Sequence, residues 1–345
     1  MSGLQRRRVH NASDSTPRLS ATPRLDEDSG HRVAYDPRDI EESPEKSKDP
    51  RLTIMEEVLL IGLKDTQGYL SFWNDNISYT LRGCILIELA FRGRIAMTQD
   101  PARRRLALPD RDIEVINAKE TGETLLDEAL KLIKSSEPQS VGSWIDLLSG
   151  ETWNLMKISY QLKQVRERLL KGLVDKGILR TEKRNFLLFD MATHPVSDTK
   201  VKDEIVRRIV DALTSRHFVL NSSNSSLLPN DIPFRYLRTV CLLCVCYAAN
   251  VLENALLSLS IDNRDHAFVR VDDLLADFSQ WPFNIQTGSS DPTIASSAGS
   301  SGPGSGSVPF AEEIMRELEE NPNHELQLEL IAAVLSVFTR LDSIL

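Results

Sequence analysis

The stretch from Gly68 to Arg94 constrains the fold most strongly, because it contains a helix that is apolar on almost every face. Residues that can cap a helix come first, and apolar residues then recur at helical spacing. The apolar positions are Ile77, Leu81, Cys84, Ile85, Leu86, Ile87, Leu89 and Ala90. Because such a helix is stable only when other elements surround it, the sequence predicts a mainly α, single globular domain with a buried central helix bundle.

Arg82 lies in the second turn of this helix, where a charged side chain among apolar neighbours is costly without a counter-charge. One interpretation is an internal ion pair with Glu88 or Asp75. The other is an anion site, because the start of a helix is also a favourable place for a phosphate. The residues alone leave both interpretations open.

Two further cations, Lys163 and Arg166, lie in a segment that we expect to form one long helix from Glu151 to about Lys176. An apolar stripe occupies one face of this helix, so the two cations project together from another face, three residues apart. Surface helices tolerate such like-charge pairs. A phosphate between the two side chains would remove their repulsion.

The short segment from Asn185 to Met191 carries four consecutive large apolar residues, which are Phe186, Leu187, Leu188 and Phe189. A strand with one face inward would not need all four. The segment is either a strand buried on both faces or a short protruding β-hairpin whose apolar side meets lipid or another subunit.

Two segments, residues 1–50 and about 287–308, are rich in Ser, Pro, Gly or charged residues and are predicted to be disordered. A folded domain is predicted over residues 51–345, after the first segment, and the second segment is a loop within this domain. The first segment contains a basic cluster, Arg6, Arg7 and Arg8. This cluster is either a solvated charge run or a linear motif that docks on an acidic partner.

The net charge of -9 argues against a surface that tracks nucleic acid, so any phosphate site must be local. No stretch reaches the ~20 apolar residues of a membrane span, which predicts a soluble or peripherally bound protein. Secondary structure is expected at Thr53 to Lys64, 94–97, 113–116, 123–134, 141–148, 198–215, 233–260, 265–278, 309–320 and 322–345.

The cysteines Cys84, Cys241, Cys244 and Cys246 lie in apolar helical patterns, which favours reduced core thiols over a metal site or disulfides. No nucleophile elbow, phosphate-binding glycine loop, zinc ligand set or pair of spaced carboxylates stands out. The sequence therefore predicts no catalytic residue, no metal, no cofactor and no enzyme activity.

Long sequence blocks resemble the Golgi phosphoprotein family of phosphatidylinositol 4-phosphate effectors, and its fungal vacuolar-protein-sorting members in particular. These blocks are Met55 to Leu60, Gly68 to Asp75, Leu81 to Cys84, Ser149 to Asn154, Val165 to Leu169 and Asn185 to Pro195. The similarity continues more loosely to the C-terminus, but the loop at 287–308 departs from the family pattern.

The resemblance implies a non-enzymatic adaptor, found in the cytosol and peripherally on the cytoplasmic side of the Golgi membrane. It implies that the protein links the cytosolic tails of Golgi glycosyltransferases to the coatomer coat for retention and retrograde sorting. Carried over by position, the lipid headgroup site comprises Trp73, Arg82, Lys163 and Arg166. The membrane or homo-oligomer hairpin comprises Phe186, Leu187, Leu188 and Phe189, and the coatomer contact comprises Arg6, Arg7 and Arg8.

The alternative is a winged-helix nucleic-acid-binding protein, in which Lys163 and Arg166 would lie on a recognition helix followed by a wing. The acidic net charge, the lack of a dense basic face and the apolar Phe186 to Phe189 segment count against it. We therefore expect no nucleic acid among the partners.

Overall fold

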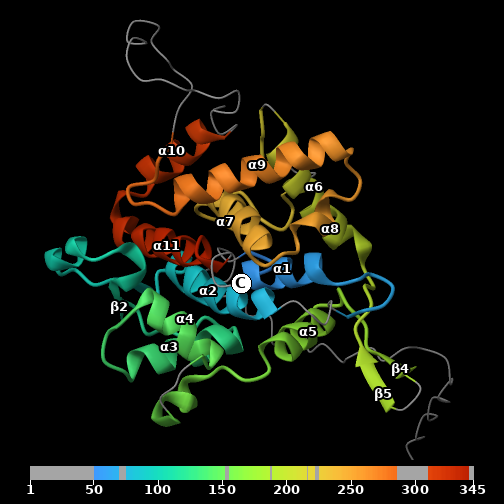
Figure 1. Cartoon of the computed structure of the whole chain (residues 1–345), viewed down its shortest axis with the longest axis horizontal. Helices are drawn as coiled ribbons and strands as arrows, with labels where there is room; N and C mark the ends of the chain where they lie inside the picture. Colours follow the sequence, from blue (N-terminus) through green and yellow to red (C-terminus); the bar gives the residue numbers. More distant parts are fainter. Residues whose placement is uncertain are drawn as a thin grey trace, which may run out of the picture. The chain divides into compact units, whose positions relative to one another are not determined.

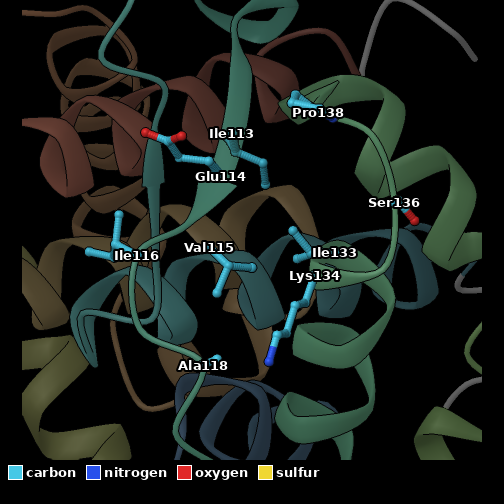
Figure 2. Close-up of a pocket in the computed structure, with 9 residues that line it drawn as sticks. All are labelled: Ile113, Glu114, Val115, Ile116, Ala118, Ile133, Lys134, Ser136 and Pro138. Carbon is cyan, nitrogen blue, oxygen red and sulfur yellow. The ribbon is translucent and has the colours of Figure 1, made fainter.

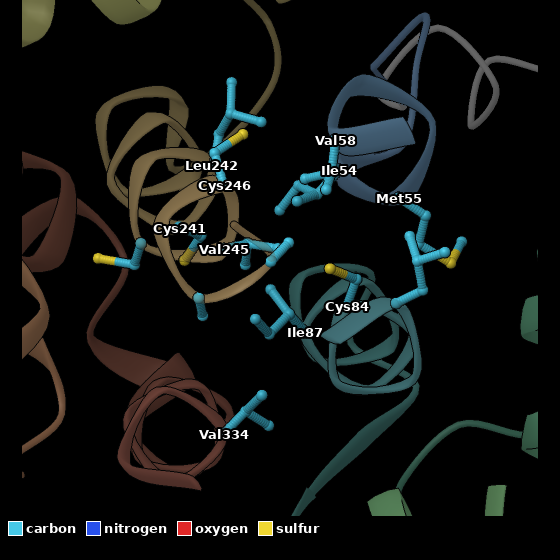
Figure 3. Close-up of a cluster of buried hydrophobic side chains, with 14 of the residues drawn as sticks. Ile54, Met55, Val58, Cys84, Ile87, Cys241, Leu242, Val245, Cys246 and Val334 are labelled. Carbon is cyan, nitrogen blue, oxygen red and sulfur yellow. The ribbon is translucent and has the colours of Figure 1, made fainter. Parts of the chain in front are cut away.

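Helix α2 (Asp75–Phe91) is the buried helix that the sequence predicts, and in the computed structural model it is the central element. Its side chains from Thr80 to Phe91 are all buried, as the apolar pattern requires. Helices α1 (Ile54–Gly62), α7 (Arg235–Ala248) and α11 (Glu325–Phe338) pack against it. Figure 3 shows apolar side chains of these four helices meeting in one core. The prediction of a mainly helical domain around one central helix is confirmed.

Helices α2 and α11 approach each other closely at Gly83. A Cβ atom at this position would come within 2.4 Å of the Phe338 ring and within 3.0 Å of Val334. Any larger residue would push the two helices apart, because a packed interior has no room to absorb it.

The cysteines are free, buried thiols in this core, as predicted. Cys84 lies on α2, and Cys241, Cys244 and Cys246 lie on α7. Figure 3 shows three of them among aliphatic side chains. Burial raises the pKa of each thiol, so these sulfurs behave as small apolar groups rather than as nucleophiles.

The remaining helices and short 3-10 turns surround this core (Figure 1). The structure describes residues 50–69, 75–151, 155–186, 189–215, 217–221, 225–285 and 310–341, all within the unit Pro44–Leu345. Further helices are α3 (Thr124–Lys134), α4 (Val141–Ser149), α5 (Val165–Asp175), α6 (Thr199–Thr214), α8 (Leu252–Leu256), α9 (Ile261–Phe278) and α10 (Ala311–Glu320). The 3-10 turns are η2 (Pro101–Arg105), η3 (Leu108–Asp110), η4 (Leu155–Tyr160) and η5 (Pro322–His324).

Two small antiparallel sheets complete the described fold. Strands β1 (Ile95–Met97), β2 (Asp112–Val115) and β3 (Gln139–Ser140) form the first, in that spatial order. Strands β4 (Glu182–Phe186) and β5 (Phe189–Thr193) form the second, a hairpin in which Phe186 pairs with Phe189. Both strand predictions near residues 94–97 and 113–116 are confirmed.

The prediction of one long helix from Glu151 to Lys176 is wrong. The structure has the 3-10 turn η4, then an extended turn, and only then helix α5. Gln164, directly before α5, has a φ of 54°, a left-handed conformation that no continuous helix accommodates. Lys163 therefore lies in the turn before α5, and Arg166 lies in the first turn of that helix.

The helix predicted from Pro233 to Ser260 is also divided, into α7 and α8. Asn250 has a φ of 53° and ends α7, and Phe234, at its start, has a φ of 60°. Asn is one of the few residues that tolerate this conformation. The apolar pattern continues across Asn250, so hydrophobic periodicity alone could not reveal the break.

A candidate anion site at the start of helix α5

Arg82 is buried, with 6% of its surface exposed, and its guanidinium donates mainly to backbone carbonyls. Its Nη1 donates to the Ser78 carbonyl at 2.7 Å and to the Ser78 hydroxyl at 2.8 Å. Its Nη2 donates to the Leu162 carbonyl at 3.1 Å, and its Nε donates to the Leu148 carbonyl at 3.4 Å. The interpretation of Arg82 as an ion-pair partner of Glu88 is wrong, and the Asp75 side chain lies outside the described residues.

Glu88 instead pairs with Arg238 of α7, at 3.2 Å, and with Arg92, at 3.5 Å. Its carboxylate also accepts a hydrogen bond from the Ile54 amide at the start of α1, at 2.9 Å. Burial alone would raise the pKa of Glu88, but Arg238 and Arg92 hold that pKa below its ordinary value. Glu88 therefore forms its ion pairs within the core and is not a counter-charge for the candidate site.

Arg82 joins the two ends of the segment between α4 and α5. Leu148 lies in the last turn of α4, where exposed carbonyls favour a cation, and Leu162 lies just before α5. The Leu162 amide also donates directly to the Leu148 carbonyl, at 3.0 Å. Burial, followed by repulsion from Arg166, lowers the pKa of Arg82 to about 10, so its guanidinium stays charged at neutral pH.

Lys163 and Arg166 lie beside this junction, and the headgroup site that they were predicted to form with Arg82 stays a prediction. Lys163 is exposed and follows Leu162 directly, whereas Arg166 is half-buried and close enough to influence the pKa of Arg82. Within the described part of the chain, neither Lys163 nor Arg166 forms an ion pair or a side-chain hydrogen bond. Arg168, on the same helix, does pair with Glu128, at 2.6 Å.

Two acidic groups that the sequence analysis overlooked, Glu167 and Glu151, lie close enough to Arg82 to oppose the lowering of its pKa. Glu151 has a raised pKa, because burial and the nearby Asp146 outweigh the attraction of Arg82. Asp146 accepts a hydrogen bond from the Tyr79 hydroxyl at 2.8 Å, and burial raises the pKa of this acid as well. Tyr79 lies three residues before Arg82, so helical spacing was the available signal.

The hairpin interpretation of the Phe186 to Phe189 segment is confirmed, and a single strand buried on both faces is not what forms. The backbones of Phe186 and Phe189 pair at the closed end of the hairpin. Leu187 and Leu188, together with the side chains of Phe186 and Phe189, lie outside the described residues. Their contact with lipid or with another subunit therefore stays a prediction.

The base of the hairpin is bonded to the loop that leads to Trp73. The His194 amide donates to the Gly68 carbonyl at 2.8 Å, and the Val196 amide donates to the Asp65 carbonyl at 3.0 Å. Gly68 has a φ of 66°, and a Cβ atom there would lie 2.3 Å from the Pro195 nitrogen. The position therefore requires glycine. Trp73 itself lies outside the described residues, so its predicted place in the site stays a prediction.

The family model described as Golgi phosphoprotein 3 (GPP34) matches residues 54–293 of the chain. The chain belongs to this family. Two relatives named vacuolar protein sorting-associated protein 74 are similar to it, one from Schizosaccharomyces pombe at 55% identity and one from Eremothecium gossypii at 50%. Each comparison covers 99% of this chain and 99% of the relative.

The range matched by the Golgi phosphoprotein family begins at the first residue of α1 and contains Arg82, Lys163, Arg166 and the whole hairpin. The family and the two relatives support a Golgi-associated role in protein sorting. The basic cluster Arg6 to Arg8 precedes the matched range and lies outside the residues that the structure describes. Its predicted contact with coatomer stays a prediction.

A cavity of about 320 Å³ lies elsewhere, between β2 and the C-terminal end of α3. Figure 2 shows Val115, Ile133 and Lys134 on its walls. None of the three site cations lines it, so the candidate anion site is a surface arrangement at the start of α5 and not this cavity. Among the described residues, no cluster of side chains could hold a metal ion, and no helix is both long and apolar enough to cross a bilayer.

Proposed function

We propose that the protein is a non-enzymatic peripheral adaptor on the cytoplasmic side of the Golgi membrane. It binds phosphatidylinositol 4-phosphate there and links the cytosolic tails of Golgi glycosyltransferases to the coatomer coat. In this role it retains those enzymes in the Golgi by retrograde sorting. Membership of the Golgi phosphoprotein family and similarity to two vacuolar sorting proteins support the Golgi part of this proposal.

The observation that carries the lipid part is the meeting of Arg82, Lys163 and Arg166 at one junction. Arg82 is held in place by carbonyls, whereas Lys163 and Arg166 have no carboxylate partner in the described chain. Placing like charges together costs free energy that an anion would recover. A phosphate is the anion that best suits several cations beside the first amides of a helix.

The cations alone are too weak to keep the protein on a membrane. Each contributes about 1 kcal/mol near an anionic leaflet, so three give about 3 kcal/mol, which corresponds to a millimolar dissociation constant. Burying two side chains of the Phe186 to Phe189 segment would add roughly 3 to 6 kcal/mol. The two contributions together bring binding into the micromolar range, which restricts residence to membranes that display the lipid.

Flotation with liposomes that contain or lack phosphatidylinositol 4-phosphate tests the lipid part. The double variant Lys163→Ala with Arg166→Ala should lose at least about tenfold in affinity for the phosphoinositide liposomes. The matched control is Lys171→Ala with Arg105→Ala, which removes two exposed cations from elsewhere and should bind as the wild type does. Equal loss in both double variants would show a non-specific charge effect and contradict the proposal.

Coatomer capture tests the adaptor part. Replacing Arg6, Arg7 and Arg8 by Ala in the full chain should abolish capture of purified coatomer and leave liposome binding unchanged. Retained capture would place the coatomer contact in the folded domain. The nucleic-acid alternative has no structural observation in its favour, since Lys163 precedes α5 and the two cations do not share a recognition helix.

A further inference from the structure

The 3-10 turn η4, between α4 and α5, presents apolar side chains to solvent. Met156 is 85% exposed and Ile158 is 46% exposed, and among the described residues Met156 is the most exposed large apolar side chain. Exposing such groups on a short turn gains nothing for folding. Two of them together indicate a surface that meets something apolar.

The inner side of η4 is firmly attached to the domain. Tyr160 packs edge-on against Trp144 with ring centres 5.9 Å apart, and its hydroxyl accepts a hydrogen bond from Ser136 at 3.2 Å. The Gln161 side-chain amide donates to the Ser149 carbonyl at 3.3 Å. Met156 and Ile158 are therefore held outward by an ordered base and do not merely belong to a loose tail.

The segment that carries η4 begins and ends at the candidate anion site. The chain that carries η4 leaves at Leu148 and returns at Leu162, and Arg82 bonds the carbonyls of both residues. In the view of Figure 1, the yellow-green η4 turn, the start of α5 and the hairpin of β4 and β5 lie along the lower edge of the described unit.

We propose that η4 is a second membrane-inserting element, with Met156 and Ile158 entering the headgroup and acyl boundary while Lys163 and Arg166 hold the lipid phosphate. This inference rests on the proposed function and adds a contact to it. Lys157 lies between the two apolar residues in the sequence but lines a pocket with Tyr160 and Glu137, so the cations of the proposed contact are Lys163 and Arg166.

A lipid surface fits η4 better than a protein partner does. Two side chains on one turn provide far less than the ~800 Å² per partner that a stable protein interface buries. Exposed apolar side chains followed in the chain by Lys163 and Arg166 match the composition of interfacial membrane elements, in which the cations stay at the headgroups. The short turn also needs no partner to order it.

An environment-sensitive fluorophore at residue 156 tests this directly. All four native cysteines are buried, so Met156→Cys adds the one thiol of the described residues that a nitrobenzoxadiazole label can reach. Emission should shift to the blue and become quenchable by spin-labelled lipid when liposomes contain phosphatidylinositol 4-phosphate. The control is Leu257→Cys, 66% exposed after α8, whose label should remain in water.

Affinity gives the second measurement. Met156→Ala with Ile158→Ala should weaken binding to phosphatidylinositol 4-phosphate liposomes about tenfold and leave binding of the soluble headgroup, inositol 1,4-bisphosphate, unchanged. Leu257→Ala with Ile261→Ala is the matched apolar control and should change neither.

The outcomes separate this inference from the proposed function. A wild type that binds neither the liposomes nor the soluble headgroup contradicts the proposed function. Normal binding with the label at residue 156 still in water contradicts only the insertion of η4. A blue shift that appears without liposomes as protein concentration rises would overturn the inference in favour of a contact between copies.

Discussion

The buried charges around Glu88 and the cations at the start of α5 are arranged in opposite ways. In the core, Glu88 meets Arg238 and Arg92, and Glu57 meets Arg208 at 2.6 Å, so acids and bases alternate. At the start of α5, Lys163 and Arg166 gather beside Arg82 instead. The core arrangement neutralises its own charge, whereas the surface arrangement places cations together, which is the basis of the proposed phosphate site.

This difference separates cations that stabilise the fold from cations available for binding. A buried cation must find its partner within the chain, because burying an isolated charge is prohibitive. A partly exposed cation can remain without a partner at little cost, since water solvates it. Arg82 lies between the two classes, because carbonyls rather than a carboxylate solvate its guanidinium.

Replacing Arg238 should break the core arrangement most severely. Its Nη1 lies 3.2 and 3.3 Å from the two Glu88 oxygens, and its guanidinium stacks over the Phe91 ring at 4.3 Å. Arg238→Met keeps an apolar stem but leaves Glu88 without its main partner. The free energy of unfolding, measured by urea denaturation, should fall by about 3 to 5 kcal/mol.

The double variant Glu88→Gln with Arg238→Met provides the control, because it removes both charges. It should recover a large part of the loss, since no uncompensated carboxylate then remains in the core. A double variant as unstable as Arg238→Met would mean that the stem packing, and not the charge pair, carries the effect.

Glu317 on α10 is an acid that meets backbone amides rather than a guanidinium. It accepts hydrogen bonds from the Tyr236 and Leu237 amides at the start of α7, at 2.9 and 3.1 Å. Burial nevertheless raises the pKa of Glu317 from 4.5 to about 7. Between these values the folded protein holds a proton that the unfolded chain releases, so this group's contribution to stability declines as pH rises from about 4.5 through about 7.

Glu317→Gln should remove that decline. Urea denaturation of both proteins at about pH 5 and about pH 7.5 should show the wild type losing up to about 3 kcal/mol relative to the variant. An identical pH dependence in the two proteins would show that the amides keep this carboxylate ionised throughout the range.

Gly68 tests whether backbone geometry, rather than charge, limits the region next to the cations. Gly68→Ala must strain a φ of 66° and also displace the backbone at Pro195, 2.3 Å from the new Cβ atom. It should cost about 1 to 3 kcal/mol and loosen the hairpin base. Gly93→Ala is the matched control, because φ there is 62° with nothing within 4 Å, and it should cost only about 1 kcal/mol.

Limited proteolysis gives the readout for the hairpin. Cleavage between β4 and β5 should accelerate in Gly68→Ala and stay unchanged in Gly93→Ala. Equal unfolding free energies in the two variants would show that the hairpin base moves to accept the Cβ atom and that the close approach at Pro195 is not a constraint.

Local chemistry was the part of the fold that the sequence could predict. Thr53 and Glu56 form a capping box at the start of the helix predicted from Thr53, with the Thr53 amide 2.9 Å from the Glu56 carboxylate. Asp198 caps α6, at the start of the element expected over 198–215. The break at Gln164 could not be predicted, because the apolar stripe runs through it without interruption and only the backbone conformation records it. The same is true of Asn250.

The candidate site likewise has a part that the sequence could predict and a part that it could not. The residue types at Arg82, Lys163 and Arg166 suggested an anion site but left an ordinary surface arrangement equally open, because water solvates an exposed cation at little cost. The partners of Arg82 were not predictable, since Leu148 and Leu162 are far away along the chain and offer carbonyls that every residue has. The interpretation that paired Arg82 with Glu88 was wrong because spacing within α2 says nothing about Arg238 on α7.

The smallest effect, and the sharpest contrast with Arg238, is expected from the surface cations themselves. Lys163→Ala with Arg166→Ala should change the free energy of unfolding by no more than about 0.5 kcal/mol, because neither side chain has an ion-pair partner among the described residues. The change should be stabilising, since Arg166 repels Arg82 and lowers its pKa. Inositol 1,4-bisphosphate should raise the melting temperature of the wild type by ligand binding and leave that of the double variant unchanged. A double variant that loses several kcal/mol of unfolding free energy would show that Lys163 and Arg166 stabilise the fold as the core cations do. That result would contradict the proposal that they are available to bind a phosphate.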